Sequence, residues 1–156
     1  MKFTHPVHRF QKFIYGVLEK QFARYFEIAE RKPGLTGENL VVILESRLDN
    51  VVFRMGLATT RRESRQLVGH GHFLVNGKRV DIPSYRVREG DVIAICDKSK
   101  KSPRVKEIVE STQGRLVPEW LEMDREALSA KVVRMPLRSD LDYDLEERLV
   151  VEYYSK

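Results

Sequence analysis

The sequence predicts an α+β fold, in which a mostly helical part accompanies a helix pair packed on a small, mainly antiparallel β-sheet. Apolar residues recur at steps of three and four over residues 9–30 and over about 38–55, which is typical of amphipathic helices. Thr60-Arg61-Arg62-Glu63 has the capping-box pattern, so a short third helix begins there. Asn76-Gly77, between two strand-like runs, predicts a tight β-hairpin because both central positions favour a positive φ.

Size and charge indicate a globular protein with a polyanionic partner. The chain has 156 residues, of which 42% are hydrophobic, enough for one compact domain or two small interlocked ones. Residues 1–106 carry 21 Lys and Arg against 11 Asp and Glu (+10), whereas residues 107–156 carry 7 against 12 (−5). The first two-thirds therefore suit RNA or DNA, and the acidic remainder suits other contacts.

Composition disfavours several classes of protein. The single cysteine, Cys96, excludes an intramolecular disulfide and fits a reducing, cytoplasmic setting. No apolar run is long enough to cross a bilayer, and residues 1–10 lack the features of a secretory signal. The four histidines have no cysteine partners at zinc-finger spacing, so neither a metal nor another cofactor is expected. Acidic residues between 140 and 147 do not follow the EF-hand order and are interpreted as a solvated loop facing a basic protein partner.

The first predicted helix, residues 9–30, combines an apolar stripe with a basic flank. Its aromatic residues are interpreted as core rather than as base-stacking platforms, since their spacing already gives them a buried face. Tyr15 lies beside the stripe and is a candidate ligand contact. Four basic residues fall largely off the stripe: Arg9, Lys12, Lys20 and Arg24. The first three are further candidate RNA contacts. Pro33-Gly34 ends the helix.

The second predicted helix, about residues 38–55, presents arginines on one face. Thr36 and Asn39 offer capping oxygens at its start. Arg47 and Arg54 are seven residues apart, so they share a face away from the apolar stripe.

The third predicted helix carries most of the chemical argument. Arg61 and Arg65 are four residues apart and stack on one face, and Arg62 flanks them. The unpaired amides of a helix N-terminus favour an anion, and the planar guanidinium fork suits phosphate oxygens. A solvated surface helix is the alternative, but three arginines against Glu63 alone leave the cluster unneutralised, which favours phosphate binding.

A glycine-rich turn follows the third helix. The glycines of Gly69-His70-Gly71-His72 allow a sharp turn, and the two histidines either hydrogen-bond RNA oxygens or close the loop. Lys78 lies just past the hairpin turn. The apolar run from Val92 to Ile95 adds another strand to the small sheet.

Long stretches of the chain resemble a known family. The stretches are RLDNVVFRMGLATTRRESRQLVGHGHFLVNGKRVDIPSYRVREGD, YGVLEKQFARYF, TGENL, VPEWLEMD and LVVEYYSK. They resemble the S4 RNA-binding domain and, over nearly the whole chain, the bacterial-type small-subunit ribosomal protein S4 family, uS4. Apolar residues of the final third, including Trp120, Leu121, Val132 and Val133, suggest short strands and loops that pack back on the first helices. An S4 domain at residues 46–106 is therefore expected to be inserted in a discontinuous domain of residues 1–45 and 107–156.

The resemblance also implies a function and a set of contacts. Family members bind 16S-type rRNA at a helix junction in the 5′ domain, nucleate subunit assembly, and touch ribosomal protein S5 at an interface linked to decoding accuracy. Some repress translation of their own messenger RNA. Carried over by position, the implied RNA contacts are Arg47, Arg54, Thr60, Arg61, Arg62, Ser64, Arg65, Gln66, His70, Gly71, His72 and Lys78. The family usually has a further N-terminal segment, so the chain resembles a shortened member.

Two other classes of function remain as alternatives. S4 domains also occur in RNA-modifying enzymes, but an enzyme needs an activated acid, base or nucleophile in a pocket. Asp49, Asp81 and Asp91 are better interpreted as polar residues of helices or turns, so no catalytic residue is predicted. The second alternative is an S4-domain regulator or docking subunit that binds RNA outside the assembled ribosome.

Overall fold

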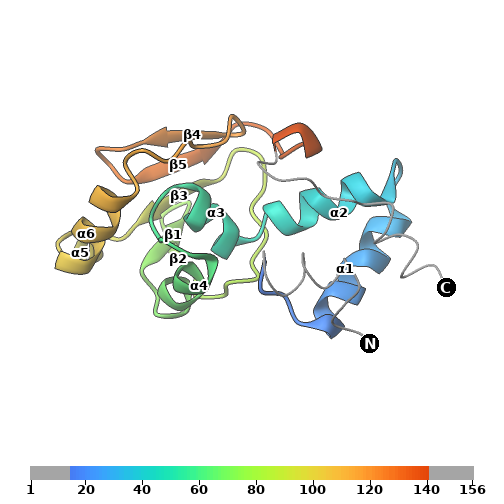
Figure 1. Cartoon of the computed structure of the whole chain (residues 1–156), viewed down its shortest axis with the longest axis horizontal. Coiled ribbons are helices and arrows are strands. Elements are labelled where there is room, and N and C mark those ends of the chain that lie inside the picture. Colours follow the sequence, from blue (N-terminus) through green and yellow to red (C-terminus); the bar gives the residue numbers. More distant parts are fainter. Residues whose placement is uncertain (1–14, 141–156) are drawn as a thin grey trace. The chain divides into compact units, whose positions relative to one another are not determined.

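A computed structural model of the chain describes residues 15–140, which divide into two compact units (Figure 1). The first unit comprises residues 15–45 and 136–140, and the second comprises residues 46–135. The regular secondary structure of the described residues consists of helices and one antiparallel sheet, which confirms the predicted α+β fold class.

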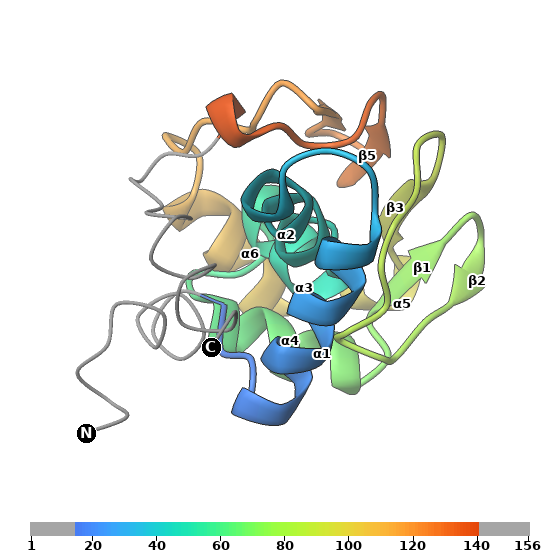
Figure 2. The same ribbon diagram turned by 90° about the vertical axis from the view of Figure 1, so that its right-hand side faces the viewer.

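The first unit is a helical pair with its own core. Helices α1 (Glu19–Arg31) and α2 (Thr36–Glu45) lie side by side, and the short 3-10 helix η3 (Arg138–Asp140) contacts α2 (Figures 1 and 2). Phe22 and Leu44 are fully buried between them, which confirms the core interpretation of the apolar stripe. The predicted break at Pro33-Gly34 is also confirmed, since Gly34 adopts a φ of +100°.

The start of α1 differs from the prediction. The helix begins at Glu19, because Gly16 adopts a φ of +68° that a right-handed helix does not allow. The predicted residues 9–14 lie outside the described part of the chain. Asn39 is also used differently, because its side-chain amide donates to the carbonyl oxygen of Ala29 at 3.0 Å instead of capping α2. It thereby satisfies a carbonyl near the C-terminus of α1.

The prediction of a single helix over about residues 38–55 is wrong, because helix α2 ends at Glu45, and Ser46 and Arg47 are not helical. Arg47 is extended, with φ −63° and ψ 141°, and forms an isolated bridge with Arg86. Helix α3 (Leu48–Arg54) then begins. The amide of Leu48 donates to Tyr85 at 2.7 Å, a hydrogen bond that a continuous helix would have made to a carbonyl four residues earlier.

The second unit places helices around a five-stranded antiparallel sheet. Its further helices are α4 (Arg61–Gly69), α5 (Asp97–Lys100) and α6 (Pro103–Ser111). Its strands are β1 (Phe73–Val75), β2 (Lys78–Arg79), β3 (Val92–Ile95), β4 (Leu121–Asp124) and β5 (Ser129–Val132). The strand order is β2-β1-β3-β5-β4. Figure 1 shows α5 and α6 next to each other at one end of this unit.

The hairpin of β1 and β2 confirms the prediction from Asn76-Gly77. Both turn residues have positive φ, at 52° and 81°, and Val75 pairs with Lys78 across the turn (Figure 2). The Asn76 side chain also bonds Asp91 at 2.9 Å, which ties the turn to the start of β3 and confirms Asp91 as a turn residue.

The expected packing of the final third is wrong for its described apolar residues. Trp120, Leu121 and Val132 belong to the core of the second unit, with Leu48, Val68 and Phe73, rather than to the core of the first helices. The reason is that β5 pairs with β3, with Ile93 opposite Ala130, so residues 121–132 extend the hairpin sheet. Val133, which follows, is 38% exposed.

Candidate nucleic-acid interface

The N-terminus of α4 is capped by Thr60. Its Oγ1 accepts from the amide of Glu63 at 3.0 Å, which confirms the first half of the predicted capping box. The carboxylate of Glu63 reaches one residue further back than expected and accepts from the amide and the hydroxyl of Thr59, at 2.7 and 2.9 Å. The first turn of α4 is therefore closely tied to the preceding loop.

Residues of α3 orient two arginines of α4. Nε of Arg61 donates to Oδ1 of the buried Asn50 at 2.9 Å, and the Arg61 guanidinium lies over the Phe53 ring, 4.4 Å from its centroid. Nε of Arg65 lies 3.7 Å from Oδ2 of the buried Asp49, while the Arg65 side chain stays 42% exposed. Both guanidinium groups are thus held in place before any ligand binds.

The remaining predicted residues of α4 divide by exposure. Arg62 and Gln66 are exposed beside the two oriented arginines. Ser64 is fully buried, and its hydroxyl donates to the carbonyl oxygen of Arg61 at 2.7 Å. Ser64 therefore supports the helix from inside, and the exposed side chains form the surface.

The structure buries several other residues that were predicted to contact RNA. Arg47 is 2% exposed, and its Nε and Nη2 donate to the two oxygens of Asp49 at 3.1 and 2.9 Å. Arg54 is 7% exposed, and Tyr15, whose hydroxyl donates to Glu45 at 2.7 Å, is 2% exposed. Sequence spacing places Arg47 and Arg54 on one helix face, but the break at Arg47 removes that shared face.

Residues outside the motif also shape the charge of this surface, which sequence reasoning missed. Arg104, at the first turn of α6, forms an ion pair with Glu63. Burial raises the pKa of Glu63, but hydrogen bonds from Thr59 and Arg104 outweigh it, and the net pKa is lowered. Because Arg104 compensates Glu63, the three arginines of α4 face less negative charge than the sequence count indicated.

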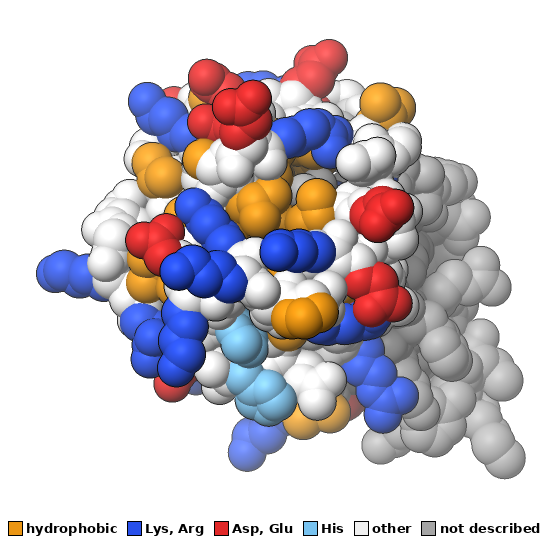
Figure 3. Space-filling view, turned by 90° about the vertical axis from the view of Figure 1, so that its left-hand side faces the viewer, with side chains coloured by type: hydrophobic (Ala, Val, Ile, Leu, Met, Phe, Trp, Pro, Cys, Tyr) orange, Lys and Arg blue, Asp and Glu red, His pale blue; other side chains and the backbone are white. Residues whose placement is uncertain are grey.

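The turn after α4 places two histidines beside further basic groups. Gly71 has a φ of +81°, and a Cβ there would lie 3.3 Å from Cδ of Arg79. His72 bonds the Ser99 hydroxyl at 2.6 Å, and burial, with the charges of His70 and Arg79, lowers the pKa of His72. His72 thereby closes the loop, whereas His70 is exposed. Figure 3 shows histidine side chains bordered by lysines and arginines on this face.

Lys78 and Lys20 are both exposed. Lys78 follows the hairpin turn in the second unit, and Lys20 lies on α1 in the first. Two further predicted contacts, Arg9 and Lys12, lie outside the described residues, as do the acidic residues after Asp140.

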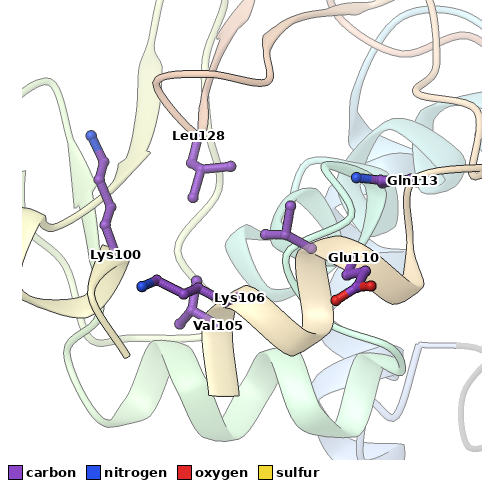
Figure 4. A pocket seen from close by; sticks show the side chains of 7 residues that line it. Lys100, Val105, Lys106, Glu110, Gln113 and Leu128 are labelled. Carbon is purple, nitrogen blue, oxygen red and sulfur yellow. The ribbon is translucent and has the colours of Figure 1, made fainter. Parts of the chain in front are cut away.

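A groove of about 370 Å³ is lined by residues from α5 to the β4–β5 turn, and none of the α4 arginines belongs to its lining (Figure 4). Val105 and Val109 of α6 and Leu128 of the β4–β5 turn form its aliphatic part, with Lys100 and Lys106 nearby. Its lining contains neither an aromatic ring nor an arginine, the groups on which unstacked bases usually stack. The groove is therefore not included in the candidate interface.

The arrangement suits binding of a polyanion. Oriented guanidinium groups at a helix N-terminus match backbone phosphates. Within residues 15–140, no group of three or more His, Cys, Asp or Glu side chains forms a candidate metal site. The same stretch also lacks a helix with the length and apolarity needed to span a bilayer. The fold and the surface together define an RNA-binding class of protein, the S4-domain proteins.

Comparisons with known proteins agree with this class and narrow it. Residues 46–93 match the S4 domain family, and residues 9–45 match the ribosomal protein S4/S9 N-terminal domain. Among similar proteins, small ribosomal subunit protein uS4 of Ruminiclostridium cellulolyticum is 62% identical over 142 residues, which cover 91% of this chain and 68% of that protein. The uS4 proteins of Acetivibrio thermocellus and Halothermothrix orenii are 63% and 59% identical, and the matched residues cover 68% and 70% of their lengths.

The chain belongs to the uS4 family of small ribosomal subunit proteins. The resemblance found in the sequence is thereby confirmed. The chain is a structural, non-enzymatic ribosomal protein with an RNA-binding S4 domain.

Proposed function

We propose that the chain binds small-subunit rRNA at a helix junction of the 5′ domain through the first turn of α4. The observation that carries the proposal is the pair of oriented arginines: Arg61 is held by Asn50, and Arg65 lies beside Asp49. Side chains that are already ordered lose less conformational entropy on binding. A-form RNA presents phosphates and 2′-hydroxyls rather than readable major-groove edges, so recognition depends on backbone shape.

The proposed contact surface follows from exposure. Its members among the described residues are Thr60, Arg61, Arg62, Arg65, Gln66, His70 and Lys78, and His72, which closes the loop, is assigned to its support. The buried Arg47, Arg54, Ser64 and Gly71 are assigned to its support rather than to direct contact. Lys20 remains a proposed contact of the first unit, together with Arg9 and Lys12, whereas Tyr15 is left out because it is buried.

Binding at such a junction supports three wider roles. We infer that the protein nucleates assembly of the small subunit, with residues 46–106 as the RNA-binding domain, and supports translational accuracy next to ribosomal protein S5. We also infer that its own messenger RNA is a second ligand. The support for these roles is membership of the uS4 family over more than 90% of the chain.

Directed hydroxyl-radical probing tests the RNA surface. An iron chelate is attached to a cysteine introduced as Gln66→Cys, in a background in which the single native cysteine is replaced by Cys96→Ser. The matched control is Glu122→Cys on β4, an exposed position outside the proposed surface. Cleavage of a 5′-domain transcript near a helix junction is expected from position 66 and not from position 122. Equal cleavage from both positions would overturn the proposed surface.

Cosedimentation separates the ribosomal role from the alternative regulator. Stoichiometric presence in purified small subunits is the expected result. Absence from subunits, with RNA binding retained, would instead establish a regulator acting outside the assembled ribosome.

A further inference from the structure

The loop between α3 and α4 is fastened by a segment 56 to 62 residues away in the sequence. Nη1 of Arg115 donates to the carbonyl oxygens of Phe53 and Ala58, both at 2.9 Å, and Nη2 donates to Thr59 at 3.4 Å. The Phe53 carbonyl, near the end of α3, also accepts from the Gly56 amide at 3.0 Å. The Arg115 guanidinium therefore adds a second tie there and links the end of α3 to the loop that leads to α4.

Thr112 fastens the same loop at a second point. It is buried at the C-terminus of α6, and its hydroxyl lies 2.6 Å from the carbonyl oxygen of Gly56, the nearest of its acceptors. Gly56 has a φ of +81°, and a Cβ there would lie 3.2 Å from Oγ1 of Thr112. The end of α6 and the loop are therefore closely packed.

Arg115 also meets Arg61 at a shared ring. The guanidinium carbons of Arg115 and Arg61 both lie over the Phe53 ring, at 4.5 and 4.4 Å from its centroid. Arg61 is further fixed by Asn50. Movement of the Phe53 ring or of the Ala58–Thr59 carbonyls would therefore change the direction in which Arg61 points.

We propose that Arg115 is a positioning residue for RNA binding, which fixes the start of α4 and the direction of Arg61 without contacting RNA itself. This inference rests on the proposed function of the α4 surface. The half-buried Arg115 guanidinium donates to three backbone carbonyls and stacks on the Phe53 ring, and these contacts occupy its donors and one of its faces. Loss of the Arg115 side chain is expected to lower the affinity for RNA by changing the orientation of Arg61, while the number of phosphate contacts stays the same.

The test is a double-mutant cycle between Arg115 and Arg61 in the full chain. Arg115→Gln, Arg61→Gln and the double variant are titrated with a 5′-domain rRNA transcript at several salt concentrations. Arg115→Gln is expected to weaken binding about tenfold and to leave the slope of log K against log salt unchanged. In the Arg61→Gln background the Arg115 substitution is expected to have little further effect, because both act on one contact.

Arg115→Lys keeps the charge but not the planar fork, and it serves where Arg115→Gln fails to fold. Arg115→Lys is expected to weaken binding to a similar extent. The matched control is Arg88→Gln, a substitution of an exposed arginine. Additive losses, a slope reduced by Arg115→Gln, or unchanged affinity in a folded Arg115 variant would each overturn the inference. If Arg61→Gln alone leaves binding unchanged, the proposed α4 surface fails instead.

Discussion

Nε of Arg61 donates to Oδ1 of Asn50 at 2.9 Å, so a buried residue of α3 orients the side chain of a half-buried arginine of α4. Asp49, the neighbour of Asn50, forms a longer ion pair with Arg65, with 3.7 Å between Oδ2 and Nε. The first turn of α3 thus contacts two arginines in the first half of α4. This relationship makes RNA affinity depend on residues that lie beneath the RNA surface.

Asn50→Ala is expected to weaken RNA binding although it removes no charge. The substitution deletes the acceptor for Nε of Arg61 and is expected to lower the free energy of unfolding by about 1–3 kcal/mol, because a buried hydrogen bond is lost. The number of phosphate contacts is unchanged, so the salt slope stays at its wild-type value. Urea unfolding and filter binding measure the two effects. Retention of full affinity by the folded variant would show that Asn50 does not direct Arg61.

Thr60→Ala removes the cap of α4. The hydroxyl that accepts from the Glu63 amide is lost, so the free energy of unfolding is expected to fall by about 1 kcal/mol. Thr60→Ser keeps the acceptor and is the matched control. Equal stabilities of the two variants in urea would contradict the capping role.

Gly56→Ala and Gly77→Ala compare two glycines that share a φ of +81°. Both substitutions introduce the cost of a left-handed residue, about 1–2 kcal/mol. A Cβ at position 56 also meets Thr112 at 3.2 Å, whereas nothing lies within 4 Å at position 77. Gly56→Ala is therefore expected to be the more destabilising in urea unfolding. Equal losses would mean that Thr112 does not pack tightly on the loop.

Stability is expected to depend on the protonation of His72. Burial, together with His70 and Arg79, lowers its pKa below the ordinary value of 6.5, so the folded protein favours the neutral ring. Above that ordinary value the contribution is fully present. As the pH falls below it, the unfolded chain binds a proton first and stability is lost down to the lowered pKa.

His72→Gln removes this dependence. The variant is expected to lose less stability than the wild type between about pH 7.5 and about pH 5.5, measured by urea unfolding at both values. Parallel losses in the two proteins would rule out the His72 contribution.

Local patterns in the sequence identified much of the candidate site. The cap at Thr60, the Asn76-Gly77 turn and the arginines of α4 depend on neighbouring residues, so sequence spacing was sufficient to predict them. The family resemblance added the identity of the domain.

The missed features all depend on contacts between distant segments. The helix break at Arg47 is set by pairing with residues near Arg86, and Arg104 and Arg115 reach the RNA surface from positions more than forty residues away. Arg47 is buried together with its salt-bridge partner Asp49. A count of charges along the sequence does not distinguish such a buried pair from exposed charges. Long-range pairing of this kind leaves little signal in local periodicity.

The most direct test of the α4 surface is the salt dependence of rRNA binding by the double variant Arg61→Ala/Arg65→Ala. The control, Arg88→Ala/Lys131→Ala, removes the same number of charges from exposed positions outside the surface. Each lost phosphate contact is expected to reduce the slope of log K against log salt by about one. The account predicts weaker binding and a slope smaller by about two for the α4 variant, with little change for the control. An unchanged slope in the folded α4 variant would contradict the claim that these arginines bind RNA phosphates.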